Sequence, residues 1–186
     1  MRIMLPFVVA AFALPASIHA EPVGVAAFRS VELRAGGDVE IVPGSVQRVT
    51  IVSGSTQFTS FRVDREGRLL IDACNARCPH NYPLRIRIES PRLPDVAVKA
   101  GGRIIAGRGF GRQARVSAAV YAGGTIDLRA LEVEDASAAV NAGGDIYVHA
   151  KSNLSAAVNA GGDIHYSGNP RVSMAVTNGG DVRRDR

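Results

Sequence analysis

The side chains best suited to chemistry are acidic residues that recur directly after pairs of glycines. Asp145, Asp163 and Asp181 each follow a Gly-Gly pair, and Thr125 holds the same place one unit earlier. Two carboxylates about 5 to 5.5 Å apart are the machinery of retaining glycosidases. Stacked strands, however, bring any repeated Asp to about that separation. We therefore interpret these residues as turn acceptors whose charge stays in water, and we predict no catalytic residue among them.

Calcium binding is the alternative for this acidic column. Calcium-binding nonapeptide coils carry their ligands at alternating positions, and the Gly-Gly-Asp motif lacks that pattern. We expect neither a metal site nor a cofactor.

A second column, two residues further along each unit, contains more varied side chains. It runs through Ile105, Asp127, Tyr147, His165 and Arg183. Tyr147 beside His165 could stack on a sugar ring or bind an anion, so Asp127, Tyr147 and His165 are candidate binding residues. A nucleophile activated by His165 would need a serine in register, and none is evident. Polar positions that vary in this way usually face solvent, and we expect the side chains to be exposed.

A third column precedes the glycines and is flanked by small residues, mostly Ala and Ser. Its members are Lys99, Tyr121, Asn141, Asn159 and Thr177. Stacked Asn side chains commonly form hydrogen-bonded ladders, which favours a structural role. A flat face of small side chains can also dock an extended polymer or a second solenoid. Tyr121, Asn141 and Asn159 are therefore the second set of candidate binding residues.

The chain contains two cysteines, Cys74 and Cys78. Thiols this close in sequence most simply form a local disulfide in an oxidising compartment. The segment CNARCPH does not have the spacing of a haem attachment motif, and a zinc site would need more ligands than these cysteines and His80 supply. We predict a structural disulfide, with a metal or redox role as the less favoured alternative.

The columns arise because the chain repeats itself. The decapeptide SAAVNAGGDI occurs unchanged at 137–146 and 155–164. Related stretches are SVELRAGGDV (30–39), DVAVKAGGRI (95–104), SAAVYAGGTI (117–126) and SMAVTNGGDV (173–182). Self-similarity at about 20 residues with strand-like alternation is typical of a solenoid. We predict an all-β fold, a single-stranded parallel β-helix of right-handed coils of about 18–22 residues, in which like side chains stack on like.

Alternation within each unit predicts which side chains form the interior. The predicted inward columns are Val98, Val120, Val140, Val158 and Val176; Val96, Ala118, Ala138, Ala156 and Met174; and Ala100, Ala122, Ala142 and Ala160. After the glycines, Ile104, Ile126, Ile146, Ile164 and Val182 continue the interior. Loop excursions long enough to wall a groove are not evident in the repeated units.

The first twenty residues predict a secretory signal peptide. Arg2 precedes a short apolar run that is too short to span a bilayer, and small residues lead to a polar break after Ala20. No later stretch is apolar enough to span a membrane. We expect an exported protein, periplasmic or extracellular, without a transmembrane anchor.

The remaining residues, 21–186, predict one domain. Within it, 21–94 form a more irregular β region, which includes a hairpin turning at Glu66–Gly67, and 95–186 form the regular coils. The net charge of +5 comes mainly from scattered arginines. This charge indicates a solvated basic surface, or attraction to anionic glycans or lipid headgroups. Nucleic acid is not an expected partner, because the chain lacks a combined aromatic and basic platform.

The order of these segments resembles a known family. FRSVELRAGGDVEIVPG near the N-terminus is followed by GRLLID, then LRIRIESPRLPDVAVKAGG, then serial Gly-Gly coils. This combination resembles the GIN-domain family, the head domain of auto-transporter adhesins, over essentially the whole mature chain. The resemblance implies a β-helical envelope or secreted protein with an adhesive or binding role. The family has no established activity and hence no catalytic residues to transfer to this sequence.

Three functions are compatible with this pattern. We favour a non-enzymatic binding or adhesion module that presents flat faces to a cell-surface polysaccharide or an envelope protein. The alternatives are a small polysaccharide-cleaving β-helix and a structural envelope protein that self-associates, for example through a flat sheet face. A cleft that contains two carboxylates beside Lys or Arg would favour the enzyme.

Overall fold

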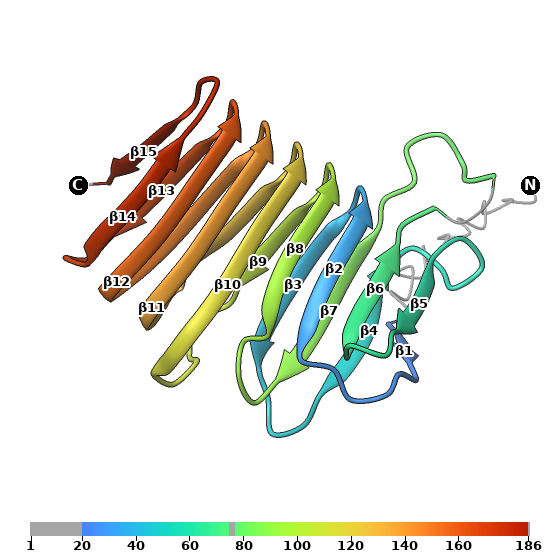
Figure 1. The fold of residues 1–186 in the computed structure, drawn as a ribbon. Coiled ribbons are helices and arrows are strands. Elements are labelled where there is room, and N and C mark those ends of the chain that lie inside the picture. The colour runs from blue at the N-terminus through green and yellow to red at the C-terminus, as the bar shows by residue number, and fades with distance from the viewer. Residues whose placement is uncertain (1–19, 75–76, 186) are drawn as a thin grey trace, which may run out of the picture.

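The protein is built from strands throughout the part that the structure describes. The computed structural model describes residues 20–74 and 77–185 (Figure 1). These ranges contain no helix, and so no helix that could cross a membrane. The all-β prediction is therefore confirmed, whereas the predicted signal peptide, 1–20, lies outside the described residues except for Ala20.

The strands follow one another along the chain as fifteen segments. They are β1 (Glu21–Val23), β2 (Ser30–Ala35), β3 (Asp38–Pro43), β4 (Arg48–Ser53), β5 (Ser60–Val63), β6 (Arg68–Asp72), β7 (Arg85–Ser90), β8 (Asp95–Ala100), β9 (Arg103–Ala106), β10 (Gln113–Ala122), β11 (Thr125–Ala142), β12 (Asp145–Ala160), β13 (Asp163–Ser167), β14 (Arg171–Val176) and β15 (Asp181–Arg184). All of these described strands belong to one mixed sheet, which carries parallel pairs along most of its length and antiparallel pairs near the N-terminus.

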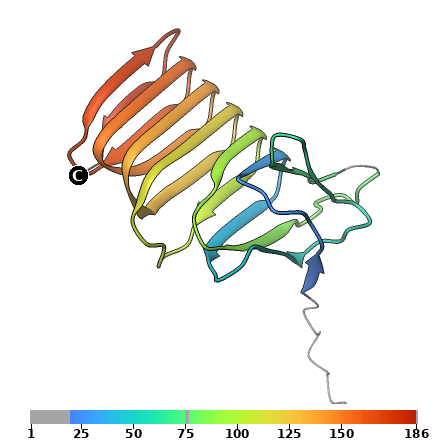
Figure 2. The same cartoon turned by 60° about the horizontal axis from the view of Figure 1, so that its bottom comes forward.

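The sheet folds into two faces that meet at the Gly-Gly corners (Figures 1 and 2). One face, here called the Asn face, contains β6, β2, β8, β10, the second halves of β11 and β12, and β14. The opposite face, here called the His face, contains β7, β3, β9, the first halves of β11 and β12, β13 and β15. Every neighbouring pair within these two series is parallel.

The repeated decapeptides stack on each other residue for residue. Ser137 pairs with Ser155 and Val140 with Val158, and Val120 pairs in the same way with Val140. The side chains of Val98, Val120, Val140 and Val158 are almost fully buried, as the alternation predicts. Because each coil gives the next coil the same neighbours, an unchanged sequence satisfies the same packing twice.

The second glycine of each corner is required by the coil before it. Gly144 has a φ of +98°, and a Cβ placed there would lie 2.6 Å from the carbonyl oxygen of Gly124 and 2.7 Å from Cγ1 of Val120. Gly143 also has a positive φ, but a Cβ placed there would meet nothing within 4 Å. The doublet therefore combines a sharp turn with close backbone contact between coils.

The predicted inward column of alanines before the glycines is wrong. Ala100, Ala122, Ala142 and Ala160 are all exposed. These residues end their strands at the corner, where the backbone already turns toward the glycines, so the alternation that holds within a strand no longer applies.

Two residues of the last described coil also depart from the prediction. Met174 and Val176 were expected in the interior, yet both are exposed. They occupy the inward positions of β14, which pairs with β12 alone. Alternation fixes the side toward which they point, but no further described strand covers them.

The N-terminal end of the stack, in contrast, is closed by irregular structure. The predicted hairpin is confirmed, since β5 and β6 pair antiparallel around a turn at 64–67. Tyr82 packs edge to face on Phe58 and exchanges hydrogen bonds with the backbone of Ser55. The predicted disulfide joins Cys74 and Cys78 in the same region.

Candidate functional site

The Asn face carries an uninterrupted file of polar side chains across successive coils. The residues before and after Tyr121 pair with the residues before and after Lys99, so these two side chains lie beside each other. Asn141 lies beside Asn159 for the same reason. The ammonium of Lys99 lies 3.3 Å from the centroid of the Tyr121 ring, and the Nδ2 group of Asn159 donates a hydrogen bond of 2.9 Å to Oδ1 of Asn141. The predicted Asn ladder is thus present, and the first three candidate binding residues, Tyr121, Asn141 and Asn159, lie together.

A shallow hollow of about 210 Å³ runs beside this file. Ala119, Ala139 and Ala157 form its floor, and the side chains of Tyr121, Asn141 and Asn159 stand along it. Tyr121 is 41% exposed although its ring contacts Lys99. The hollow therefore combines an apolar floor, an accessible aromatic edge and amide groups that can donate or accept hydrogen bonds.

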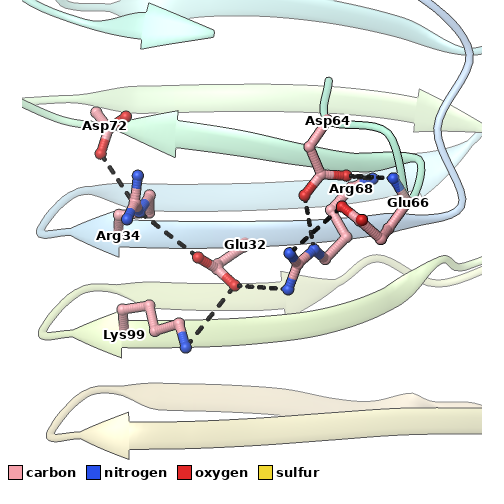
Figure 3. Close-up of polar contacts among 7 residues, drawn as sticks. All are labelled: Glu32, Arg34, Asp64, Glu66, Arg68, Asp72 and Lys99. Carbon is pink, nitrogen blue, oxygen red and sulfur yellow. Dashed lines mark hydrogen bonds and ion pairs between the residues drawn. The ribbon is translucent and has the colours of Figure 1, made fainter. Parts of the chain in front are cut away.

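A charged cluster closes the N-terminal end of the same face (Figure 3). Glu32 pairs in register with Ala97 and so continues the alanine file into β2. Its carboxylate is only 8% exposed and is surrounded by three cations, with contacts of 3.5 Å to Arg34 and 3.9 Å each to Arg68 and Lys99. A buried carboxylate needs such partners because its desolvation is otherwise costly.

The cations around Glu32 are held in turn by carboxylates of β6 and the preceding turn. Arg34 contacts Asp72 at 3.6 Å, and Nε of Arg68 donates to Oδ2 of Asp64 at 2.8 Å. The backbone N–H of Arg68, and then its guanidinium, hold the pKa of the Asp64 carboxyl below its ordinary value. Lys99 therefore connects a fixed ionic cluster to the Tyr121 end of the hollow.

The sequence analysis missed this cluster. An alignment of SVELRAGGDV with DVAVKAGGRI places Glu32 in the alanine column and Arg34 beside Lys99. The alignment could therefore have predicted that Glu32, Arg34 and Lys99 lie close together. The rest of the cluster comes from β6, which lies beside β2 without being part of the repeat.

The other three candidate residues lie on the His face, beyond the Gly-Gly corner. Asp127 pairs with Tyr147, and Tyr147 pairs with His165. The Tyr147 and His165 rings stack with centroids 4.4 Å apart. Arg129 binds Asp127 through contacts of 3.0 and 2.6 Å and lies 4.7 Å from the Tyr147 centroid. The two sets of candidate residues therefore form two separate surfaces.

His165 is buried, which corrects the expectation that it faces solvent. Its Nδ1 lies 3.0 Å from a carboxylate oxygen of Asp185, and the Arg183 guanidinium lies against both ring nitrogens. Tyr147 covers the ring from the preceding coil. These neighbours on both sides leave little of His165 to contact a ligand.

The acidic column at the corner behaves in part as predicted. Oδ1 of Asp181 accepts the N–H of Val182 at 2.8 Å, which is the expected turn contact. Asp145, Asp163 and His165 offer ligand atoms within 4.8 Å of one another, so these three residues could approach a cation. The guanidinium of Arg183 lies 3.9 Å from Asp163 and also contacts His165, and its positive charge opposes a cation there.

A serine and a histidine on adjacent coils form a contact that the sequence analysis did not anticipate. Ser167 Oγ lies 3.0 Å from Nδ1 of His149, and Glu132 pairs with His149 on the other side. Glu132 is largely exposed and contacts Lys151 at 4.0 Å. Ser167 lines neither of the two hollows described here.

Loops opposite the Gly-Gly corners wall a second, larger hollow of about 920 Å³. The sequence analysis expected no such excursions in the repeated units, and this expectation is wrong for the segment before β10. The segments before β2 and β8, which form the other walls, belong to the irregular region 21–94. The side-chain amides of Gln47 and Gln113 fix the loops through hydrogen bonds to both backbone groups of Phe28 and of Leu93.

The loop hollow contains carboxylates beside arginines, the arrangement that would favour an enzyme. Its charged residues are Arg29, Arg92, Asp95, Arg112, Arg115, Glu134 and Asp135. Each of the three carboxylates accepts a hydrogen bond from a residue of the neighbouring coil. Asp95 accepts the N–H of Ser117, and Glu134 and Asp135 accept from Ser152 and Asn153. All three therefore already have a hydrogen-bond donor within the stack, and the charges of the hollow nearly cancel.

Comparison with known proteins confirms the family resemblance for the central coils. Residues 106–170 match the family described as "Putative auto-transporter adhesin, head GIN domain". This segment includes the floor of the Asn-face hollow and both decapeptides. No curated protein matches the chain.

One solved structure is similar to this chain in fold, and two others match it less well. A "putative adhesin" from Bacteroides fragilis superposes with a TM-score of 0.53 at 17% identity, over 90% of this chain and 96% of that one. A "putative adhesin" from Parabacteroides merdae gives 0.44 at 13% identity, over 92% and 98%. A "putative lipid binding protein" from Parabacteroides distasonis gives 0.38 at 15%, over 90% and 96%. The first of these establishes similarity of fold alone.

Proposed function

We propose that this chain is an exported, non-enzymatic adhesion module that binds an extended polysaccharide along its Asn face. The domain comprises 21–186 and is a single-stranded parallel β-helix, right-handed, with the signal peptide removed. The stacked parallel strands support the β-helix, and the names of the matched family and of the similar structure support an adhesive role. The location, at the cell surface or in the periplasm, is part of the proposal.

The carrying observation is the composition of the Asn-face hollow. Its floor of Ala119, Ala139 and Ala157 lets a flat polymer approach the sheet closely. The Asn141 and Asn159 amides lie one strand spacing apart, about 4.8 Å, so that successive units of a polymer can each meet an amide. Tyr121 adds an aromatic surface, on which the apolar face of a sugar ring packs favourably.

A glycan array with one pair of matched variants tests this proposal. Ala139→Trp fills the floor of the Asn-face hollow, and Ala114→Trp places the same bulk in the loop hollow, at an equally exposed alanine of β10. We expect purified residues 21–186 to bind a polysaccharide, Ala139→Trp to abolish binding, and Ala114→Trp to retain it. No binding by the wild type, or loss with Ala114→Trp alone, would reject the Asn face as the site.

A polysaccharide-cleaving enzyme is the second candidate, because the loop hollow does contain carboxylates beside arginines. Its test is release of reducing ends from the polysaccharide that the array identifies. Cleavage that Asp135→Asn abolishes would establish the enzyme and would displace the adhesion module.

A further inference from the structure

Three arginines of the loop hollow have no acidic partner within the described part of the chain. Arg92 and Arg112 form no hydrogen bond or ion pair there, and Arg29 donates only through Nε, to a backbone carbonyl oxygen at 2.9 Å. All three side chains are exposed. Because a guanidinium carries five N–H donors, the hollow presents many donors that the described residues leave unused.

The carboxylates of the hollow do not take up these donors. Asp95, Glu134 and Asp135 accept hydrogen bonds from the neighbouring coil, and Asp135 also lies 3.7 Å from the fourth arginine, Arg115. Four arginines and three carboxylates leave one net positive charge in the hollow. Long-range attraction of an anion is therefore weak, and binding depends on direct contact with the guanidinium groups.

Two glutamine side chains fix the backbone beside these arginines. The amide of Gln47 binds both backbone groups of Phe28, at 3.0 and 2.6 Å, and the amide of Gln113 binds both backbone groups of Leu93, at 2.7 and 3.1 Å. Phe28 and Leu93 are also buried in the core. Each arginine is a direct chain neighbour of one of these residues, in the pairs Phe28–Arg29, Arg92–Leu93 and Arg112–Gln113. The loops that carry the arginines are thus ordered before any ligand arrives, which lowers the entropic cost of binding.

We propose that the loop hollow binds a phosphate-bearing ligand through Arg29, Arg92 and Arg112. The three arginines lie on separate segments, before β2, β8 and β10, and these strands are neighbours in the sheet. A phosphate offers several oxygens in a tetrahedral arrangement, so it can accept from guanidinium groups of different segments at once. The two oxygens of a carboxylate lie in one plane with its carbon and suit a single guanidinium better.

The size and the lining of the hollow narrow the ligand further. Its volume of about 920 Å³ has room for a short chain of phosphates or for a lipid headgroup, since ligand pockets typically measure about 300–1,000 Å³. Phe28 is the one aromatic residue among the described lining residues, and it is only 6% exposed. Nucleic-acid bases would therefore find no ring on which to stack.

Isothermal titration calorimetry of purified residues 21–186 with sodium tripolyphosphate tests a soluble ligand. We expect saturable binding that the double variant Arg92→Gln/Arg112→Gln weakens at least tenfold, with an unchanged melting temperature because these side chains contact no other described side chain. Arg62→Gln/Arg85→Gln is the matched control, since it removes the same charge from exposed arginines outside the hollow. Equal losses in both double variants would mean unspecific attraction to the basic surface and would overturn the site.

The same titration with tricarballylate, which carries three carboxylates, tests the choice of phosphate. Tricarballylate should bind more weakly, because its planar groups cannot each contact arginines of several segments. Equal or tighter binding would overturn phosphate as the ligand.

Co-sedimentation with vesicles of phosphatidylglycerol, against vesicles of phosphatidylcholine, tests the lipid headgroup as the source of the phosphate. Selective binding to phosphatidylglycerol that Arg92→Gln/Arg112→Gln removes, without binding of tripolyphosphate, would assign the hollow to an anionic membrane surface. Binding of tripolyphosphate alone would assign it to a soluble ligand. If neither probe binds, or if the double variant retains the binding, the proposal is overturned.

Two tryptophan variants separate this inference from the proposed polysaccharide binding, because the two hollows share no lining residue. Ala114→Trp fills the loop hollow and should weaken the binding of phosphate, whereas Ala139→Trp fills the Asn-face hollow and should leave it unchanged. Failure to bind any polysaccharide would reject the proposed function and leave this result intact. Loss of phosphate binding with Ala139→Trp alone would overturn the loop hollow as the phosphate site.

Discussion

The amide of Asn159 donates its hydrogen bond to the amide of Asn141, the residue at the same position in an identical decapeptide one coil earlier. This contact shows directly how repetition in the sequence becomes stacking in space. It also sets the geometry of the candidate site, since the same repetition places a bare alanine floor beside the amides.

Val140→Asp should unfold the domain. The Val140 side chain is 2% exposed between its counterparts in adjacent coils, and an unpaired carboxylate there would be strongly disfavoured. We expect a loss of more than about 4 kcal/mol, seen as the absence of a cooperative transition in circular dichroism. Asn141→Asp is the control. It keeps an oxygen acceptor for Asn159 and should leave the melting curve nearly unchanged, and a stable Val140→Asp would contradict the inward assignment.

The two glycines of one corner should respond differently to alanine. Gly143→Ala meets no neighbour and bears only the strain of a positive φ, about 1 kcal/mol. Gly144→Ala adds contacts below 3 Å with the preceding coil, so its cost should exceed about 3 kcal/mol. Urea unfolding of both variants measures the difference. Equal costs would mean that the corner is not packed against the coil before it.

Acid should remove the contribution of Asp127. Hydrogen bonds from the Arg129 side chain hold the pKa of the Asp127 carboxyl below its ordinary value, against a smaller opposing effect of burial. The ionised form is therefore the stabilising one. Its contribution is complete above the ordinary pKa of Asp and is lost as pH falls through the lowered value.

Asp127→Asn should consequently destabilise the protein by about 1 kcal/mol at pH 6. The difference from wild type should narrow as the pH falls below the ordinary pKa of Asp, about 3.9. Urea unfolding at each pH measures this difference. Asp145→Asn serves as control, because that carboxylate forms no ion pair within the described chain. If the difference in the free energy of unfolding became larger in acid, the ionised form of Asp127 would not be the stabilising one.

Asp163→Asn should change little. The Asp163 carboxylate is partly exposed and lies 3.9 Å from Arg183, which is typical of a weak surface pair. We expect a change in the free energy of unfolding below about 1 kcal/mol and unchanged polysaccharide binding. Loss of an activity or of a bound cation on this substitution would revive the catalytic or calcium interpretation of the acidic column.

The sequence predicts most of the pairing between stacked strands, but it does not predict where the strands and the stack end. The unchanged decapeptides predict that Val140 meets Val158, because identical segments in stacked coils share their neighbours. Alternation alone cannot show where a strand ends, so it assigned the exposed Ala122 to the interior. Nor can it show whether a further coil follows, and it therefore placed Met174 among buried residues.

The polar sites depend on contacts that the repeat does not encode. Glu32 is buried because β2 lies between β6 and β8, and β6 comes from outside the repeated units. His165 is buried because Arg183 and Asp185 of the following coil cover it. The burial of both residues depends on which long side chains of neighbouring strands cover them. Alignment of the repeats does not give that information.

The most direct test of the Asn face as a binding surface is a titration of ¹⁵N-labelled protein with the array-selected polysaccharide, followed by NMR. The side-chain amide signals of Asn141 and Asn159 should shift with increasing ligand, while those of Gln113 in the loop hollow stay in place. Shifts at Gln113 with Asn141 and Asn159 unmoved would contradict the assignment.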